Sequence, residues 1–441
     1  MKRLLSLLLC AVLALFCATT AQAAGVSITL TASEYGLHYA FDAGAQDPFV
    51  ILEYATPAEK GWMMLYSADG HFEGDVSLAY SGAGGKTSVA LTSARTTGSI
   101  GKASTTLPKA ADYQKPTGKS NAKVTDFVLT ETPEGFHYAF NAIGTDYMLL
   151  YWRSKEQTVT QPVYPDENGH YEGDVVSELT FARTQFTVQV KSGSGSMKKE
   201  ATVRKGYQAP EAPQRQEGRL SGVTVCIDAG HQENGRFVNE PIGPGLTGST
   251  SGKGGMAQGT KTNRRESIVC LEIGMLLRDE LLRQGANVVM TREDQTTFHT
   301  NIERCEIAEA GGAQIMLRLH CNNSSNRSKR GIQVYGPLNS DYAKAVADAD
   351  TYREMGQKLL DAMKTRVGMT LANSTGMVRL NDNYVGNNWA KMMCFLVEMG
   401  YLSNPAEEYL LVTPVYQQWL AEGMADGVYE IAVARGWVQA Q

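Results

Sequence analysis

Two separated motifs in the first half of the chain recur farther along at one common offset. Tyr35-Gly-Leu-His-Tyr-Ala-Phe41 returns as Glu134-Gly-Phe-His-Tyr-Ala-Phe140, and Gly70-His-Phe-Glu-Gly-Asp-Val76 returns as Gly169-His-Tyr-Glu-Gly-Asp-Val175. Both pairs are 99 residues apart. Agreement at two separated places indicates a tandem duplication, so the first half is expected to contain two copies of one unit shorter than that offset.

Each copy has the residue pattern of an all-β unit. Apolar or alternating segments such as Phe49–Tyr54 and Tyr147–Trp152 are separated by clusters of Gly, Asp, Ser and Asn, which is typical of short strands joined by turns. We therefore predict two β-sandwich-like units of immunoglobulin or fibronectin type, over residues 25–105 and 124–204. The repeated histidines are interpreted as structural and are assigned no chemistry: His38, His71, His137 and His170.

The residue pattern changes after a linker predicted at residues 205–220, which contains two prolines and few apolar residues. Beyond it, apolar strand-like segments alternate with amphipathic helix-like segments. This alternation predicts an α/β domain over residues 221–437, with helices flanking a largely parallel sheet. Strands are expected at 223–227, 287–290, 314–319, 331–335 and 393–397, and helices at 266–283, 302–310, 341–366 and 414–435.

The first residues have the features of a secretory signal peptide. Lys2 and Arg3 precede an apolar run from Leu4 to Ala18, and Ala21-Gln-Ala23 supplies a small-x-small cleavage site. Because the apolar run is short for a bilayer span, we predict a cleaved signal peptide over residues 1–23. The protein is then expected to be a bacterial, Sec-exported protein of the cell wall or periplasmic space, with no membrane association after cleavage.

Cysteine usage and net charge argue against several classes of protein. The formal net charge is −5 and there is no long basic run, which argues against a nucleic acid or an anionic membrane surface as the main partner. Two of the seven cysteines fall in the predicted signal peptide. The other five lie in apolar segments and are expected to be buried thiols, with one disulfide left open: Cys226, Cys270, Cys305, Cys321 and Cys394.

Three polar side chains stand at the ends of three predicted strands: His231, His320 and Glu398. In open α/β sheets, ligands collect beyond the carboxyl ends of the strands, so these three side chains are expected to converge. Glu266 is different, because it lies in the first turn of a predicted helix. Asn263-x-x-Glu266 fits a capping box, and spacing alone favours that structural role.

Residues from about 223 to 435 carry a series of ordered motifs. These are Asp228-Ala-Gly-His231, Glu266 followed by Gly285-Ala-Asn-Val-Val-Met-Thr-Arg292, Arg304 with Ala308, Arg318-Leu-His-Cys-Asn322, and Glu398-Met-Gly-Tyr-Leu-Ser-Asn404 with Glu407 or Glu408 downstream. In this order the motifs resemble those of the zinc-dependent N-acetylmuramoyl-L-alanine amidases of the type-3 family. The resemblance has two departures, Ala229 for proline and Arg318 for serine, and a long loop at residues 232–263.

The resemblance implies a secreted enzyme that hydrolyses the amide between N-acetylmuramic acid and L-alanine in peptidoglycan. It implies one catalytic Zn²⁺ held by His231, Glu266 and His320, with Glu398 as the general base. Cys321 is expected to point away from His320, and His299 is interpreted as an ordinary polar residue before a helix. Supporting roles are expected for three residues: Asn322, Arg292 and Arg304.

Two other functions stay open at this stage. One is a zinc peptidase that acts on stem peptides or proteins. The other, from a different class, is a non-catalytic cell-wall-binding protein with an inactive amidase-like half. In each case the β units are expected to bind the wall or a partner at its surface, an expectation that rests on the order of the domains alone.

Overall fold

The computed structural model of the protein describes residues 19–22, 25–32, 36–57, 60–78, 84–96, 98–109, 122–132, 135–145, 147–153, 158–176, 184–192, 196–205, 211–232, 238–250, 255–368 and 378–440. Most of the predicted signal peptide, part of the predicted linker and two stretches of the predicted 232–263 loop lie outside these residues. The chain divides into two compact units. One holds the β-rich first half, and the other holds residues 204–441 with two short segments from the first half.

The first β-rich region contains two antiparallel sheets, with strand orders β1-β2-β3-β6 and β5-β4-β7-β8. Side chains alternate between the two faces of each strand, and the inward ones from both sheets form one apolar cluster. The strands are β1 (Thr19–Gln22), β2 (Ser27–Ala32), β3 (Gly36–Asp42), β4 (Phe49–Ala55), β5 (Lys60–Tyr66), β6 (His71–Ser77), β7 (Gly85–Ser93) and β8 (Ser99–Leu107).

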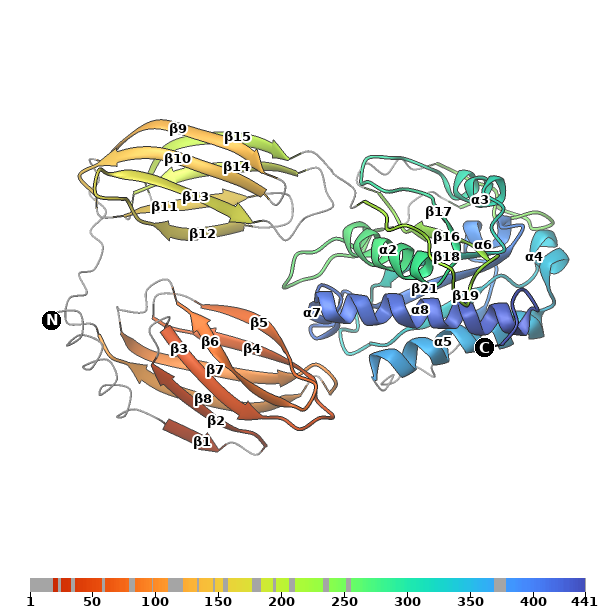
Figure 1. Ribbon diagram of the computed structural model, residues 1–441, viewed down its shortest axis with the longest axis horizontal. Helices are drawn as coiled ribbons and strands as arrows, with labels where there is room; N and C mark the ends of the chain where they lie inside the picture. Colours follow the sequence, from red (N-terminus) through yellow and green to blue (C-terminus); the bar gives the residue numbers. More distant parts are fainter. Residues whose placement is uncertain are drawn as a thin grey trace. The chain divides into compact units, whose positions relative to one another are not determined.

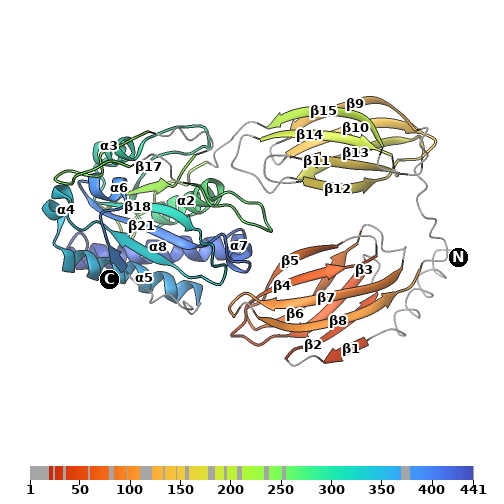
Figure 2. The same ribbon diagram turned by 180° about the vertical axis from the view of Figure 1, so that it is seen from behind.

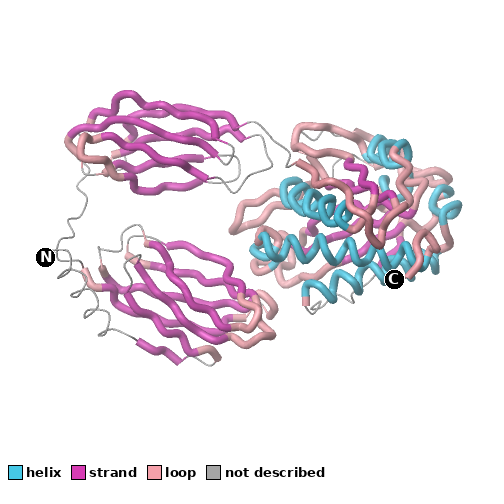
Figure 3. The backbone as a smooth tube through the Cα atoms, viewed as in Figure 1, coloured by secondary structure: helices cyan, strands magenta, loops and turns pink. Residues whose placement is uncertain are grey.

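The second β-rich region has sheets of order β13-β10-β9 and β12-β11-β14-β15, and these also share one apolar cluster. Apart from β1, its strands correspond in order to those of the first region, and both regions are built of strands and loops (Figure 3). The strands are β9 (Lys123–Thr132), β10 (Gly135–Ile143), β11 (Met148–Arg153), β12 (Thr158–Val163), β13 (His170–Val176), β14 (Thr184–Lys191) and β15 (Met197–Lys205).

The second half of the chain is an α/β domain built on a six-stranded mixed sheet of order β17-β16-β18-β21-β19-β20. Neighbouring strands are parallel except for β19 and β21, which are antiparallel. The α/β class predicted from the sequence is therefore correct for this domain. The strands are β16 (Thr224–Ala229), β17 (Asn287–Met290), β18 (Ile315–Asn322), β19 (Gln333–Gly336), β20 (Val378–Leu380) and β21 (Met393–Tyr401).

Helices flank this sheet, as the opposite views in Figure 1 and Figure 2 show. On one face α2 packs close to the sheet, where Gly274 lies against Ile227 and Ala229, and α8 packs against both α2 and α5. On the other face, Cys305 and Ala308 of α3 pack against the sheet with Cys226 and Met316. The helices are α2 (Glu266–Arg283), α3 (Asn301–Ala310), α4 (Asp341–Val346), α5 (Ala349–Val367), α6 (Val385–Trp389), α7 (Glu407–Leu410) and α8 (Pro414–Ala434). Among the described helices, none has the length and apolar character needed to cross a membrane.

Several predicted elements differ from the observed ones. The helix predicted at 341–366 is two helices, because Ala347 is extended and the Asp348 side chain caps α5 by accepting a hydrogen bond from the Thr351 amide at 2.7 Å. Strands β18 and β21 continue beyond the predicted ends at residues 319 and 397. As a consequence, His320 and Glu398 lie within strands rather than after them.

Candidate metal centre

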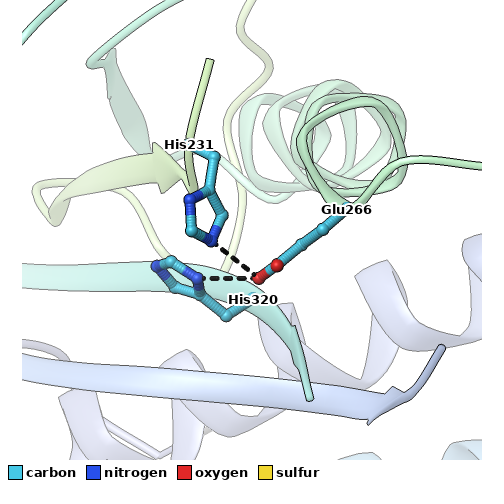
Figure 4. A group of neighbouring side chains, drawn as sticks. All are labelled: His231, Glu266 and His320. Atoms are coloured by element: carbon cyan, nitrogen blue, oxygen red, sulfur yellow. Dashed lines mark hydrogen bonds and ion pairs between the residues drawn. The ribbon is translucent and has the colours of Figure 1, made fainter. Parts of the chain in front are cut away.

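Three side chains from separate elements meet at the carboxyl-terminal edge of the parallel strands. His231 follows β16, His320 lies in β18, and Glu266 is the first residue of α2. The Oε1 atom of Glu266 lies 3.1 Å from His231 Nε2 and 2.9 Å from His320 Nδ1 (Figure 4). The three candidate ligand atoms all lie within 4.8 Å of one another. The structure thus brings together the three residues expected to bind the metal.

His231 reaches this position through an uncommon backbone conformation. Its φ angle is 59°, in the left-handed region that residues other than glycine seldom adopt. The Nη2 atom of Arg304 donates to the His231 carbonyl at 3.1 Å and holds this turn. The preceding residue must be small, because a Cβ at Gly230 would lie 2.4 Å from the Leu319 carbonyl oxygen and 2.6 Å from the His320 ring. Gly230 therefore allows the two histidine-bearing segments to pack closely.

Glu266 does not cap its own helix. Helix α2 has Arg265 as its N-cap residue, so the capping box predicted from Asn263 is wrong. Instead, Oε2 of Glu266 accepts a hydrogen bond from the Ala257 amide at 2.8 Å, and Oε1 accepts one from the Cys321 amide at 3.0 Å. Burial alone would raise the pKa of Glu266, but hydrogen bonds with the two histidines hold it well below its usual range. The carboxylate is therefore ionised and fixed in orientation.

Glu398 lies beside His320 in the sheet. The two residues are register partners on the parallel strands β18 and β21, so their side chains leave the sheet on the same face. Burial, and then the negative charge of Glu266, raises the pKa of Glu398 to about 8. Burial lowers the pKa of His320, which keeps its ring neutral as metal binding requires. Among the described residues, neither His320 Nε2 nor Glu398 Oε2 has a hydrogen-bond partner, although both atoms are buried.

Arg292, predicted to have a supporting role, connects the segments that carry two of the candidate ligands. Its Nε donates to the Ala229 carbonyl at 2.7 Å, and its Nη2 donates to the carbonyls of Gly230 at 2.9 Å and Ser267 at 2.7 Å. These carbonyls belong to the end of β16 and to the first turn of α2. A single buried guanidinium thereby fixes the distance between the first histidine and the glutamate.

A buried ion-pair cluster supports the same edge of the sheet. Asp228, which has no solvent exposure, accepts hydrogen bonds from Arg304 Nη1, from Arg318 Nε at 2.9 Å and from Thr291 Oγ1 at 2.8 Å. Burial would raise the pKa of Asp228, but the charges of the two arginines hold it well below its usual range. Arg304 also donates to the Ala229 carbonyl at 3.0 Å. Both arginines therefore stabilise the strand end that precedes His231.

This cluster was not predicted from the sequence, where Asp228 is only part of a motif and Arg318 only a departure from the resembled family. Their positions in the two strands could have predicted the ion pair. Asp228 and Arg318 are register partners on neighbouring parallel strands, so their oppositely charged side chains lie on the same face of the sheet. The Arg318 guanidinium fits only because residue 386 is glycine, where a Cβ would lie 2.3 Å from it.

A cavity of about 530 Å³ opens beside the candidate ligands. His231, Glu266, His320 and Glu398 line it together with Asn322, whose Nδ2 lies 3.3 Å from Gln333 Oε1. The predicted site residues thus share one cavity, apart from Arg292, which lies behind it. Several residues to which the sequence analysis gave no role in the site complete the wall, among them Val238, Glu240, Phe298, His299, Asn301 and Tyr384.

Two other residues of the motifs have structural roles. Cys321 is 2% exposed, and burial together with the neighbouring Cys270 thiol raises its pKa well above its usual value, so the thiol stays protonated. Glu408 accepts hydrogen bonds from the amides of Lys261 at 2.8 Å and Thr262 at 3.2 Å, and it anchors the chain segment that leads into α2. Neither Cys321 nor Glu408 contributes a ligand atom to the candidate metal site.

Comparison with known proteins places the second half of the chain in context. Residues 225–430 match the model of a family described as N-acetylmuramoyl-L-alanine amidase. The germination-specific N-acetylmuramoyl-L-alanine amidase of Bacillus subtilis is 26% identical over 231 residues, which cover 49% of this chain and 83% of that protein. A probable cell wall amidase of Staphylococcus aureus is 27% identical over 218 residues, covering 48% of this chain and 60% of that protein. A solved N-acetylmuramyl-L-alanine amidase from Mycobacterium smegmatis is 17% identical with a TM-score of 0.44, and the match covers 49% of this chain and 99% of that one.

Proposed function

Because residues 225–430 form an N-acetylmuramoyl-L-alanine amidase domain, we propose that this protein hydrolyses the amide between N-acetylmuramic acid and L-alanine in peptidoglycan. The observation that carries the proposal is the convergence of His231, Glu266 and His320 beside Glu398 in one cavity. The names of the two curated relatives, a germination-specific amidase and a probable cell wall amidase, agree with a wall substrate.

The donor set suits a single catalytic Zn²⁺. Zinc binds nitrogen and oxygen ligands at about 2.0–2.1 Å, so neighbouring ligands of a tetrahedral ion lie roughly 3.3 Å apart. The contacts of Glu266 with the histidines, at 3.1 and 2.9 Å, are close to that separation. Two histidines and one carboxylate leave a position for water, as in catalytic rather than structural zinc sites. A bound zinc ion would lower the pKa of that water and polarise the scissile carbonyl.

Glu398 is the residue proposed to move protons. Its Oε2 atom has no partner among the described residues and its side chain lines the cavity, so that oxygen can accept a proton from the attacking water. The pKa of Glu398 is about 8 in the metal-free protein, and the positive charge of a bound zinc ion would lower it. The ionised carboxylate could then take a proton and afterwards donate it to the departing amine of L-alanine. The same carboxylate therefore serves as base and then as acid.

The finer features of the protein belong to the same proposal. We infer that residues 1–23 are a cleaved signal peptide, that the mature protein is secreted, and that the two β-rich regions are repeated sandwich-like units that hold the enzyme on the wall. What supports this is the residue pattern of the first 23 positions, the 99-residue offset of the two motifs, and the matching strand order of the two regions.

The test is a digest of purified cell wall by the wild type, by chelator-treated protein and by Glu398→Gln. We expect the wild type to release new L-alanine amino termini and peptide-free glycan. The chelated protein and Glu398→Gln should be slower by about 10²- to 10⁴-fold, with zinc content preserved in the variant. Glu293→Gln, a substitution at an exposed position outside the cavity, serves as the matched control.

The same digest separates the alternatives. Cleavage within the stem peptide, with muramoyl linkages intact, would replace the amidase by a zinc peptidase. Undiminished wall lysis after chelation and in Glu398→Gln would refute the proposed mechanism. If the purified protein contained no zinc and hydrolysed nothing, the result would support the third alternative, a non-catalytic cell-wall-binding protein.

A further inference from the structure

The loop that precedes α2 contains a short closed segment at residues 238–250, which we call the docked hairpin. Its two arms are joined by hydrogen bonds from the Ile242 amide to the Gly248 carbonyl at 3.1 Å and from the Thr250 amide to the Glu240 carbonyl at 3.0 Å. An isolated antiparallel bridge joins the arms between these two bonds. The segment therefore has backbone hydrogen bonds of its own, although it belongs to no sheet.

The side chain of Glu240 attaches this hairpin to α3. Glu240 is 5% exposed, its Oε1 accepts a hydrogen bond from the Ile302 amide at 2.8 Å, and its Oε2 accepts from the Asn301 amide at 3.2 Å and from Asn301 Nδ2 at 2.7 Å. The first amides of a helix have no partner within it and favour a negative charge. Thr300 and Glu303 satisfy the neighbouring amides through a capping box, so Glu240 completes the first turn of α3.

Helices α4 and α6 hold the rest of the hairpin. Trp389 Nε1 donates to the Pro241 carbonyl at 2.8 Å, and Asn388 Nδ2 donates to the Ile242 carbonyl at 3.0 Å. The Pro244 carbonyl accepts from the first amide of α4 at 3.0 Å. Helix α6 also packs against α3 and α4 (Figure 1). Three mutually supported helices thus fix the hairpin as a permanent part of the domain.

One end of the docked hairpin faces the cavity that contains the candidate metal ligands. Val238, Glu240 and Thr250 line this cavity, and Phe298 lines it as well. Val238 is an apolar side chain with 39% exposure, whereas the Glu240 carboxylate is occupied by α3. Binding cavities use apolar side chains to bury the apolar groups of a ligand. The hairpin therefore presents an isopropyl group to whatever enters the cavity.

We propose that the docked hairpin is part of the substrate site, that Val238 is a specificity residue which contacts a methyl group near the scissile amide, and that Glu240 is a positioning residue which holds Val238 in place. This inference rests on the proposed amidase activity and deepens it. The substrate has methyl groups on both sides of that amide, on L-alanine and on the lactyl and acetyl groups of the muramic acid. A methyl contact stabilises the bound substrate and the transition state alike, so its loss raises KM and leaves kcat nearly unchanged.

The test is steady-state hydrolysis of a soluble muropeptide by the zinc-loaded, full-length wild type, Val238→Ala and Glu240→Ala. We expect each variant to raise KM about tenfold, the low end for a lost apolar contact, and to change kcat by less than about twofold. The double variant should have the KM of Glu240→Ala, because both substitutions remove the same contact. Thr247→Ala, at an exposed position of the hairpin outside the cavity, is the control and should behave as the wild type.

Val238→Ala keeps the proposal testable even if Glu240→Ala is unstable, because Val238 is partly exposed. Its effect is also measured without turnover, as the affinity of zinc-loaded Glu398→Gln for the same muropeptide, which Val238→Ala should weaken about tenfold. An unchanged KM and affinity in Val238→Ala, or a fall in kcat alone, overturns the proposal. A wild type that does not cleave the muropeptide refutes the proposed function, and this inference with it.

A second muropeptide, with glycine in place of L-alanine, identifies the methyl group. A smaller effect of Val238→Ala on this substrate would show that Val238 contacts the L-alanine methyl. An equal effect on both substrates would assign the contact to the muramic acid side of the amide.

Discussion

At the scale of single residues, Glu398 combines a proposed catalytic role with a cost to stability. Burial and the charge of Glu266 raise its pKa from 4.5 to about 8. Between these pH values the unfolded chain releases a proton that the folded, metal-free chain retains, so the free energy of unfolding falls as the pH rises. We expect Glu398→Gln to raise the free energy of unfolding of the metal-free protein at pH 8 by at least about 2 kcal/mol. Urea unfolding across this range measures it.

The pH profile distinguishes this electrostatic effect from a change in packing. At pH 4, where the carboxyl group is protonated in both states, the variant and the wild type should have nearly equal stability. Glu293→Gln, at an exposed position outside the cavity, should follow the wild type at every pH. A stability gain in Glu398→Gln that is independent of pH would contradict the electrostatic explanation.

Gly230 makes a different contribution, because it determines how closely the two histidines approach. A Cβ there would lie 2.4 Å from a backbone oxygen and 2.6 Å from the His320 ring. Gly230→Ala is therefore expected to displace His231 or His320 and to weaken zinc binding by about 10- to 100-fold, as measured by competition with a chelator. Gly255→Ala, where an added Cβ meets nothing within 4 Å, is the matched control. Equal zinc affinity in both variants would show that the turn tolerates a side chain.

The candidate residues differ in how far the sequence alone could predict them. His231, His320 and Glu398 follow from strand ends, because parallel strands bring their carboxyl ends to one edge. Glu266 could not be predicted in this way, since its partners, the Ala257 and Cys321 amides, are 9 and 55 residues away. Local spacing favoured a helix cap, and only the family resemblance indicated a ligand.

At the scale of elements, the ends of strands and helices were the hardest features to predict. Helix α2 and strand β17 match their predicted bounds because apolar periodicity extends to both ends. Strands β18 and β21 extend beyond their predicted ends. His320 and Glu398 face the cavity, and a polar side chain in that position does not interrupt the backbone hydrogen bonds between the strands. The break between α4 and α5 depends on the Asp348 side chain, whose capping bond has no distinct sequence pattern in a run of Ala and Asp.

Arg318 illustrates how elements support one another beneath the site. It connects β18 to Asp228 of β16 and, through Nη2, to the Asn301 side chain of α3 at 2.7 Å. Replacing it with the serine of the resembled family leaves Asp228 with one cation instead of two. Removal of one partner leaves the buried charge of Asp228 only partly neutralised. We therefore expect Arg318→Ser to lower the free energy of unfolding by roughly 3 kcal/mol.

A double-mutant cycle with Asp228→Asn checks the physical reason for this loss. If Arg318 acts by neutralising Asp228, the loss caused by Arg318→Ser should be smaller in the Asp228→Asn background, as measured by urea unfolding. Additive losses would show that the arginine contributes through packing against Gly386 and α3, and not through the ion pair.

At the scale of the whole molecule, the chain joins two kinds of unit: an α/β domain that contains the candidate site, and two β-rich regions. The α/β domain fixes its chemistry at one edge of one sheet. Each β-rich region has its own apolar cluster, and the described residues that line the cavity all belong to the α/β domain. This favours a contribution from the surfaces of the β-rich regions. Tandem surface modules raise the local concentration of a joined enzyme on an insoluble substrate without altering its chemistry.

Removal of the β-rich regions is therefore expected to separate retention from catalysis. A protein lacking residues 25–205 should remain active on small soluble muropeptides, because its cavity and candidate ligands lie at or beyond residue 230. Its retention on sedimented wall should fall about tenfold or more, since multivalent attachment is lost. Full-length Glu398→Gln, which keeps both β-rich regions, should sediment with the wall as the wild type does. Unchanged retention after the deletion would assign wall binding to the α/β domain itself, whereas loss of activity on soluble muropeptides would show that the β-rich regions contribute to catalysis.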